Sequence, residues 1–338
     1  MPLPFFMPVF QFSFFCFYLL FKIFPNLFIE QILFSYYNAI MSVILHNSIL
    51  KLKIETPAQK YRGSRFDWNG TVTQIWFNGK KMLSGEKMSF HRNDRIYGRG
   101  LHNEFGIKNC IGYDEIPVGE YFAKIGTGWL KKDEKPYFFY TQYKLEPLDF
   151  TWSQSSDTKA VFVCRAENHN GYAYTYTKTV ELNADSFSIN YLLENTGEKR
   201  ISTTEYVHNF FLPCNNDVNP SLELEFNWNY DKEKLSENVR TQGLVDFTEK
   251  GIKFNKIPSE EYFLGGVWEA RSDSSFSENG FWKLTDSKNG VTISEHDSFV
   301  PYHCDVWGHR KCISPELFIW LDVPPSEKES WCRTYKFE

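Results

Sequence analysis

The stretch YAYTYTKTVEL spans residues 172 to 182, and SFSINYLL follows it at residues 186 to 193. Thr and Tyr alternate along the first stretch, and a period of two in β-branched and aromatic residues is typical of a β-strand. Asn183, Ala184 and Asp185 separate the two stretches, and Asn and Asp favour tight turns. These residues therefore predict an antiparallel hairpin.

Similar segments lie on both sides of this hairpin, and Asn-, Asp- and Gly-rich turns separate several of them. They are Thr71 to Phe77, Lys159 to Arg165, Ile201 to Phe211, Ser221 to Trp228, Glu261 to Ala270, Phe281 to Thr285, Val291 to Ser294 and Leu317 to Val323. Asp231 to Arg240 is the only segment that suggests a short helix. No Pro- or Ser-rich linker interrupts residues 46–338, so we predict an all-β chain forming one large antiparallel β-sandwich there.

Residues 1–45 form an apolar leader that we leave out of the predicted fold. Residues 1–40 hold 11 of the 32 Phe, with Lys22 and Glu30 as their only charged residues. Two interpretations stay open. Residues 5–34 are a membrane anchor, or Met41 is the true start and the protein is cytoplasmic.

Composition narrows the class of partner. Lys and Arg total 37 against 42 Asp and Glu, and a net charge of −5 argues against nucleic acid as the main partner. The seven Cys are widely spaced and include no C-x-x-C, which is typical of buried thiols in a reducing compartment. No complete nucleotide- or dinucleotide-binding motif occurs, so we expect no cofactor.

Four residues near the C-terminus, His303, Cys304, His309 and Cys312, are of types that bind zinc. Their spacing does not match a standard zinc finger, and adjacent residues in a strand point to opposite faces. We therefore predict no metal site.

Two residues are candidates for acid–base chemistry. His208 lies among aromatic residues in a predicted strand, where a histidine is more often structural than catalytic. Glu316 follows Pro315 and precedes an apolar run, Leu317 to Leu321. A carboxyl at the edge of a buried strand tends to have a raised pKa, which suits a base that works near neutrality.

Together these segments resemble the aldose 1-epimerase, or galactose mutarotase-like, family over roughly residues 50 to 338. The resemblance rests on His208-Asn-Phe-Phe211 after the turn Asn195-Thr-Gly197, and on Pro315-Glu316 before a last strand, Trp331 to Phe337. It implies a galactose mutarotase-like supersandwich, an isomerase that interconverts the α and β anomers of a free aldose, His208 as general acid and Glu316 as general base.

The residues that would bind the sugar are less well defined. Trp307 and His309 are our candidates for stacking and hydrogen bonding, and Arg99 lies where family members contact the sugar. The His-Gly-Gly stretch of well-known members is missing, which indicates a divergent branch and leaves its specificity for galactose open. Two alternatives stay open: a non-catalytic carbohydrate-binding protein, or a mutarotase of a sugar phosphate bound by some of Arg62, Arg65, Arg92, Arg95 and Arg99.

Overall fold

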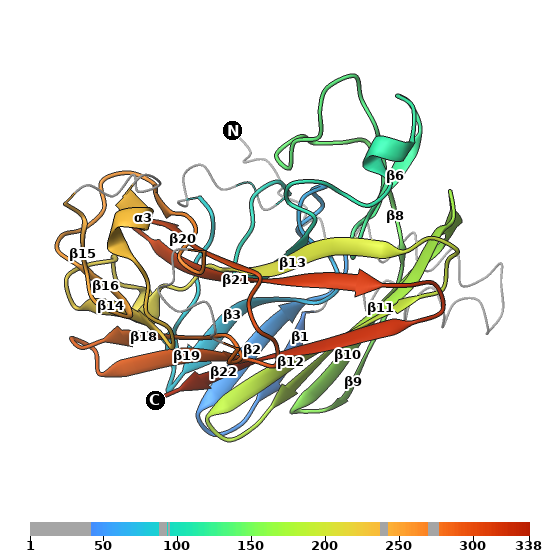
Figure 1. The fold of residues 1–338 in the computed structure, drawn as a ribbon. Helices are drawn as coiled ribbons and strands as arrows, with labels where there is room; N and C mark the ends of the chain where they lie inside the picture. Colours follow the sequence, from blue (N-terminus) through green and yellow to red (C-terminus); the bar gives the residue numbers. More distant parts are fainter. Residues whose placement is uncertain (1–41, 88–92, 94, 237–242, 270–276) are drawn as a thin grey trace, which may run out of the picture. The chain divides into compact units, whose positions relative to one another are not determined.

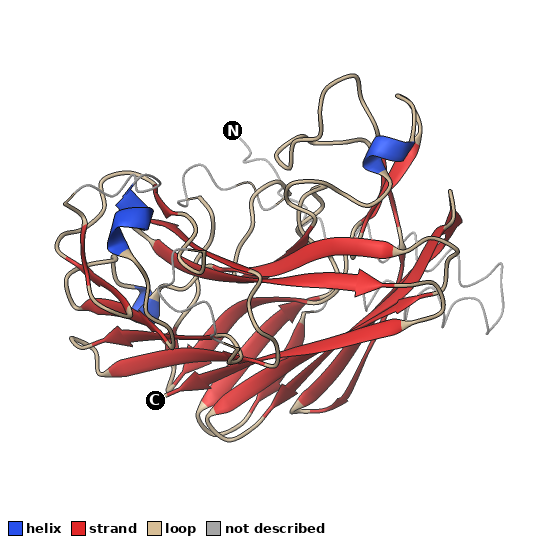
Figure 2. Cartoon of the chain, viewed as in Figure 1, coloured by secondary structure: helices blue, strands red, loops and turns tan. Residues whose placement is uncertain are grey.

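A computed structural model describes residues 42–87, 93, 95–236, 243–269 and 277–338. Within these residues the regular secondary structure is almost entirely antiparallel strands, in two large sheets and one small one (Figures 1 and 2). This confirms the predicted all-β antiparallel sandwich. The leader proposed as a membrane anchor, residues 5–34, and Met41 lie outside the described residues.

The first sheet has nine strands in the order β1-β2-β3-β5-β13-β21-β20-β17, and β4 pairs with β3. Its strands are β1 (Val43–His46), β2 (Leu50–Glu55), β3 (Thr71–Phe77), β4 (Lys80–Lys81), β5 (Leu101–Phe105), β13 (Ile201–Asn209), β17 (Tyr262–Leu264), β20 (His303–His309) and β21 (Cys312–Val323). Four strands that lie side by side in this sheet come from three distant parts of the sequence; they are β5, β13, β21 and β20.

The second sheet has ten strands in the order β15-β16-β14-β18-β19-β22-β12-β11-β10-β9. They are β9 (Asp149–Ser156), β10 (Lys159–His169), β11 (Tyr172–Leu182), β12 (Ser186–Asn195), β14 (Leu222–Phe226), β15 (Val245–Phe247), β16 (Gly251–Phe254), β18 (Phe281–Asp286), β19 (Val291–Asp297) and β22 (Lys328–Phe337). The third sheet consists of β6 (Tyr121–Lys124), β7 (Gly128–Lys131) and β8 (Leu145–Pro147).

The predicted hairpin is present as β11 and β12, and β3 also matches its predicted range. β1 begins at Val43, slightly before the predicted boundary at residue 46, and pairs Val43 with Ile54. The predicted helix appears as α3 (Lys232–Ser236), and residues 237–240 lie outside the described part. None of the helices in the described residues is long and apolar enough to cross a bilayer.

The two large sheets enclose the core. Alternate side chains of β11 point inward, so the aromatic ring of Tyr176 stacks near those of Tyr191 on β12 and Trp331 on β22. Burial of large aromatic side chains contributes about 25 cal/mol per Å² of apolar surface removed from water. The Tyr-rich alternation that predicts the hairpin therefore also supplies the core.

A buried ion pair network crosses the core between the sheets. Arg333 of β22 is fully buried, and its guanidinium donates to Glu205 of β13 at 2.9 Å and to Glu295 of β19 at 3.0 Å. Arg333 also donates to the backbone oxygen of Leu317 at 3.1 Å, and Asn209 Nδ2 donates to that of Pro315 at 2.8 Å. The network therefore holds the backbone on both sides of Glu316.

Candidate active site

The two candidate catalytic residues lie opposite each other on neighbouring strands. β13 and β21 pair Tyr206 with Phe318, and the same register two residues further places His208 opposite Glu316. The register also pairs His102 of β5 with His208 and Asp305 of β20 with Glu316. Because side chains in line across a sheet share a face, these four ionisable residues form one row.

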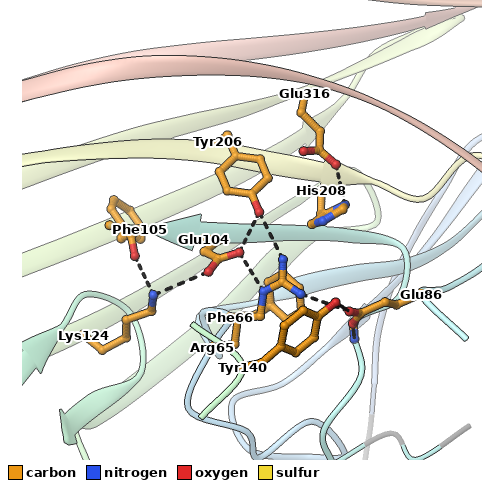
Figure 3. A network of polar contacts seen from close by, with 12 residues as sticks. Arg65, Phe66, Glu86, Glu104, Phe105, Lys124, Tyr140, Tyr206, His208 and Glu316 are labelled. Carbon is orange, nitrogen blue, oxygen red and sulfur yellow. Dashed lines mark hydrogen bonds and ion pairs between the residues drawn. The ribbon is translucent and has the colours of Figure 1, made fainter. Parts of the chain in front are cut away.

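His208 and Glu316 are in direct contact (Figure 3). His208 Nδ1 lies 2.7 Å from Glu316 Oε1, and Ser314 Oγ donates to the same carboxyl oxygen at 2.9 Å and lies 3.1 Å from Nδ1. Among the described residues, neither His208 Nε2 nor Glu316 Oε2 forms a hydrogen bond. These two atoms are therefore the ones left for a ligand.

Burial decides how protons are distributed over this pair. Desolvation and the nearby Arg65 charge lower the pKa of His208 to about 3. Desolvation and the neighbouring Asp305 carboxylate raise the pKa of Glu316 well above its ordinary value. Both shifts favour the uncharged forms, in which one proton is shared between Glu316 and Nδ1 and the other ring hydrogen of His208 is on Nε2.

Arg65 forms a second polar group beside the pair (Figure 3). Its guanidinium donates to Glu104 at 2.8 Å, to Glu86 at 3.0 Å and to the Tyr206 hydroxyl at 3.3 Å, and that hydroxyl donates to Glu104 at 2.6 Å. Burial disfavours the charge of Arg65, but these carboxylates outweigh it and raise its pKa. The guanidinium is therefore a fixed cation held in a defined orientation.

The pair of His208 and Glu316 and the neighbouring Arg65 all line one cavity of about 950 Å³. Aromatic side chains line much of it, and polar side chains converge at its inner end, which is the usual composition of a small-molecule site. The lining includes Arg65, residues 107–115, Phe139, Tyr140, Tyr172, Arg200, residues 202–204, Tyr206, His208, Glu261, Phe263, Tyr302, His303, Asp305, Trp307, Glu316, Phe318 and Trp320.

Of the three predicted sugar-binding residues, the structure places one in the cavity lining and two outside it. Trp307 lines the cavity, with its ring 5.5 Å from that of His208. His309 packs against Trp307 but is not part of the lining, because its Nε2 is 3.1 Å from the Gly85 oxygen. Arg99 is also outside the lining: it is buried against Glu55, since Gly100 turns the chain with a φ of +70° before β5 begins.

The structure does not bring the described arginines, or the His and Cys residues near the C-terminus, together into a site. Arg62 and Arg95 are exposed, and Arg92 lies outside the described residues; of the other four predicted phosphate-binding arginines, only Arg65 lines the cavity. His303 contacts Asp305 and Glu269, whereas Cys304 points into the core. Within the described part of the chain, no group of His, Cys, Asp and Glu side chains could hold a metal ion.

Sequence reasoning missed Asp305, Ser314 and Tyr206, and considered Arg65 only as a phosphate ligand. A signal for Asp305 was present, because His303, Asp305 and Trp307 alternate along β20 and share a face. That signal becomes informative only when β20 is known to pair with β21.

No protein-family model matches the chain, and no curated protein matches it by sequence. Solved structures do match by shape. The Slr1438 protein from Synechocystis sp. PCC 6803 is 14% identical with a TM-score of 0.53, and covers 88% of this chain and 96% of its own.

Two further structures agree. A galactose mutarotase-like protein from Lactobacillus casei is 11% identical with a TM-score of 0.52, covering 88% of this chain and 100% of its own. An aldose epimerase homologue from C. elegans is 12% identical with a TM-score of 0.51, covering 88% and 98%. The chain therefore has the fold of the galactose mutarotase-like and aldose epimerase-like proteins.

Proposed function

We propose that this protein is a divergent aldose 1-epimerase, an isomerase that interconverts the α and β anomers of a free sugar. The contact between His208 and Glu316 carries the proposal, because it leaves one donor, Nε2–H, and one acceptor, Oε2, on two joined side chains that line the same cavity. The hydroxyl and the ring oxygen on C1 of a pyranose are bonded to the same carbon. A single site must therefore reach both with an acid and a base that are close together.

The shared proton gives a balanced reaction. Glu316 Oε2 takes the proton of the C1 hydroxyl while His208 Nε2–H gives its proton to the ring oxygen. The bond between C1 and the ring oxygen breaks, C1 becomes the aldehyde carbon, and the proton on Oε1 of Glu316 passes to Nδ1. Rotation about the C1–C2 bond and reversal of these transfers give the other anomer, and the pair recovers its first state.

The charges around the site favour a neutral sugar over a sugar phosphate. Arg65 is already paired with Glu86 and Glu104, and Arg200 at the cavity wall pairs with Asp322 at 2.8 Å. Asp305 adds a further carboxylate to the same wall. A phosphate here would compete with these carboxylates, whereas sugar hydroxyls can donate to them.

Polarimetry tests the proposal. Freshly dissolved α-glucose, α-galactose, α-xylose and glucose 6-phosphate should reach anomeric equilibrium faster with the protein than without it, with the largest acceleration for a free sugar. Largest acceleration of glucose 6-phosphate would contradict the neutral substrate. Binding of a sugar without acceleration would instead favour the carbohydrate-binding alternative.

The low pKa of His208 leads to a prediction for the dependence of kcat/KM on pH below neutrality. The pair is active when His208 and Glu316 are both uncharged and share one proton. His208 takes up an additional proton and becomes charged only near pH 3. We therefore expect kcat/KM to stay nearly constant as the pH falls through 6.5, where an ordinary histidine would titrate. A decline centred near pH 6.5 would contradict this proton distribution.

The charge of Asp305 leads to a prediction for the decline of kcat/KM at alkaline pH. Its carboxylate raises the pKa of Glu316, so Asp305→Asn should lower that pKa. The pair loses its shared proton when the pH rises through the pKa of Glu316, so the alkaline decline of kcat/KM should move to lower pH in this variant. Asp217→Asn, outside the cavity lining, is the matched control and should leave the decline in place. An unchanged decline in Asp305→Asn would refute the electrostatic role.

A further inference from the structure

The face of β21 that carries Glu316 continues outward as an aromatic surface. Glu316, Phe318 and Trp320 alternate along the strand and all line the cavity. Glu316 and Phe318 are 4% and 5% exposed, whereas Trp320 is 48% exposed. Trp320 therefore extends the face of the buried acid–base pair with an exposed aromatic ring that lines the same cavity.

A second aromatic ring and several polar groups accompany Trp320. The ring of Tyr302 lies 5.3 Å from that of Trp320 and is 52% exposed, and its backbone N–H donates to Phe318. On the neighbouring strand β13, Thr204 is paired with Trp320, and Ser202 lies two residues further out. Both hydroxyl residues and Arg200 line the same cavity. We call Trp320, Tyr302, Thr204, Ser202 and Arg200 the outer subsite.

The outer subsite is too far from the acid–base pair to touch the sugar that reacts there. Trp320 is four residues from Glu316, which corresponds to about 13 Å along a strand. That length exceeds one pyranose ring, and a cavity of about 950 Å³ is at the upper end of the range for small-molecule sites. One monosaccharide at His208 would leave the outer subsite unfilled.

We propose that the outer subsite binds the second sugar unit of a reducing oligosaccharide whose reducing end lies at His208 and Glu316. The placement of C1 rests on the proposed function. An aromatic face stacks on the apolar C–H face of a pyranose, and the hydroxyls of Ser202 and Thr204 with the guanidinium of Arg200 match its polar edge. The outer subsite supplies both kinds of contact.

Exchange NMR on glucose, maltose, cellobiose and lactose tests this proposal, because all three disaccharides end in a reducing glucose. We expect kcat/KM for at least one disaccharide to exceed that for glucose by roughly tenfold, the amount that an aromatic contact supplies. Trp320→Ala should bring this ratio close to one. Trp76→Ala is the matched control, because Trp76 on β3 is outside the cavity lining and should keep the wild-type ratio.

The outcomes separate the outer subsite from the proposed function. A ratio close to one in the wild type, or an equal ratio in wild type and Trp320→Ala, overturns the outer subsite and leaves the mutarotase intact. If no sugar is accelerated, the proposed function fails, and saturation-transfer NMR of disaccharide binding decides about the outer subsite. Binding lost in Trp320→Ala alone supports it, and no binding to the wild type overturns it. A dimer that Trp320→Ala dissociates without changing sugar discrimination overturns it as well.

Discussion

Glu316→Gln is expected to lower kcat/KM for anomer exchange by about 10²- to 10⁴-fold, the usual contribution of a positioned acid or base. The amide has nearly the same shape and can still accept from Ser314, but it cannot take the proton of the C1 hydroxyl. His208→Asn should cost a similar factor, because it removes the donor to the ring oxygen. Exchange NMR at several protein concentrations measures both.

The double variant makes this prediction sharper. His208 and Glu316 act as one unit joined at 2.7 Å, so the double variant should lose little more than either single one. Glu225→Gln on β14 is the matched control, since this carboxylate pairs with Lys283 away from the cavity. Turnover at the wild-type level in either single variant would remove the mechanism.

Arg333→Met should lower the free energy of unfolding by about 3–5 kcal/mol, because it removes one partner of a buried ion pair network. Glu205, Glu295 and Asp297 would remain buried without their cation. Urea denaturation measures the change, through the midpoint and slope of the transition.

The matched control for Arg333→Met is a second arginine on the surface. Arg310 pairs with Asp217 at 2.7 Å but is 57% exposed, so Arg310→Met should cost less than about 1 kcal/mol. Equal effects of the two variants would show that burial of the network adds nothing. A clear difference would support a network that also holds the backbone beside Glu316.

The parts of the fold that follow from local pattern could be predicted. β11 and β12 have strict alternation and a turn between them, so their range and pairing follow from neighbouring residues. β5 could not be predicted in this way. Its sequence LHNEF carries polar residues at three of five positions, and all five are buried. Two of those polar side chains, Glu104 and Asn103, form hydrogen bonds with the distant residues Arg65 and Glu205.

The candidate site was predictable only in part for the same reason. The resemblance to the family suggested His208 and Glu316, and the structure places them in contact. Arg99 shows the limit of that reasoning. It lies next to β5 in the sequence, yet a left-handed turn at Gly100 directs it to Glu55, whereas Arg65 lines the cavity. Which arginine lines the cavity depends on backbone geometry that residue types do not reveal.

Exchange NMR on equilibrated aldoses tests the central claim most directly, because it observes the transfer between the α and β anomers without any coupled reaction. The account predicts cross-peaks between the two C1 protons that grow with the concentration of wild-type protein and are absent with an equal amount of folded Glu316→Gln. Exchange at the buffer rate for every sugar tested with folded wild-type protein would contradict the account.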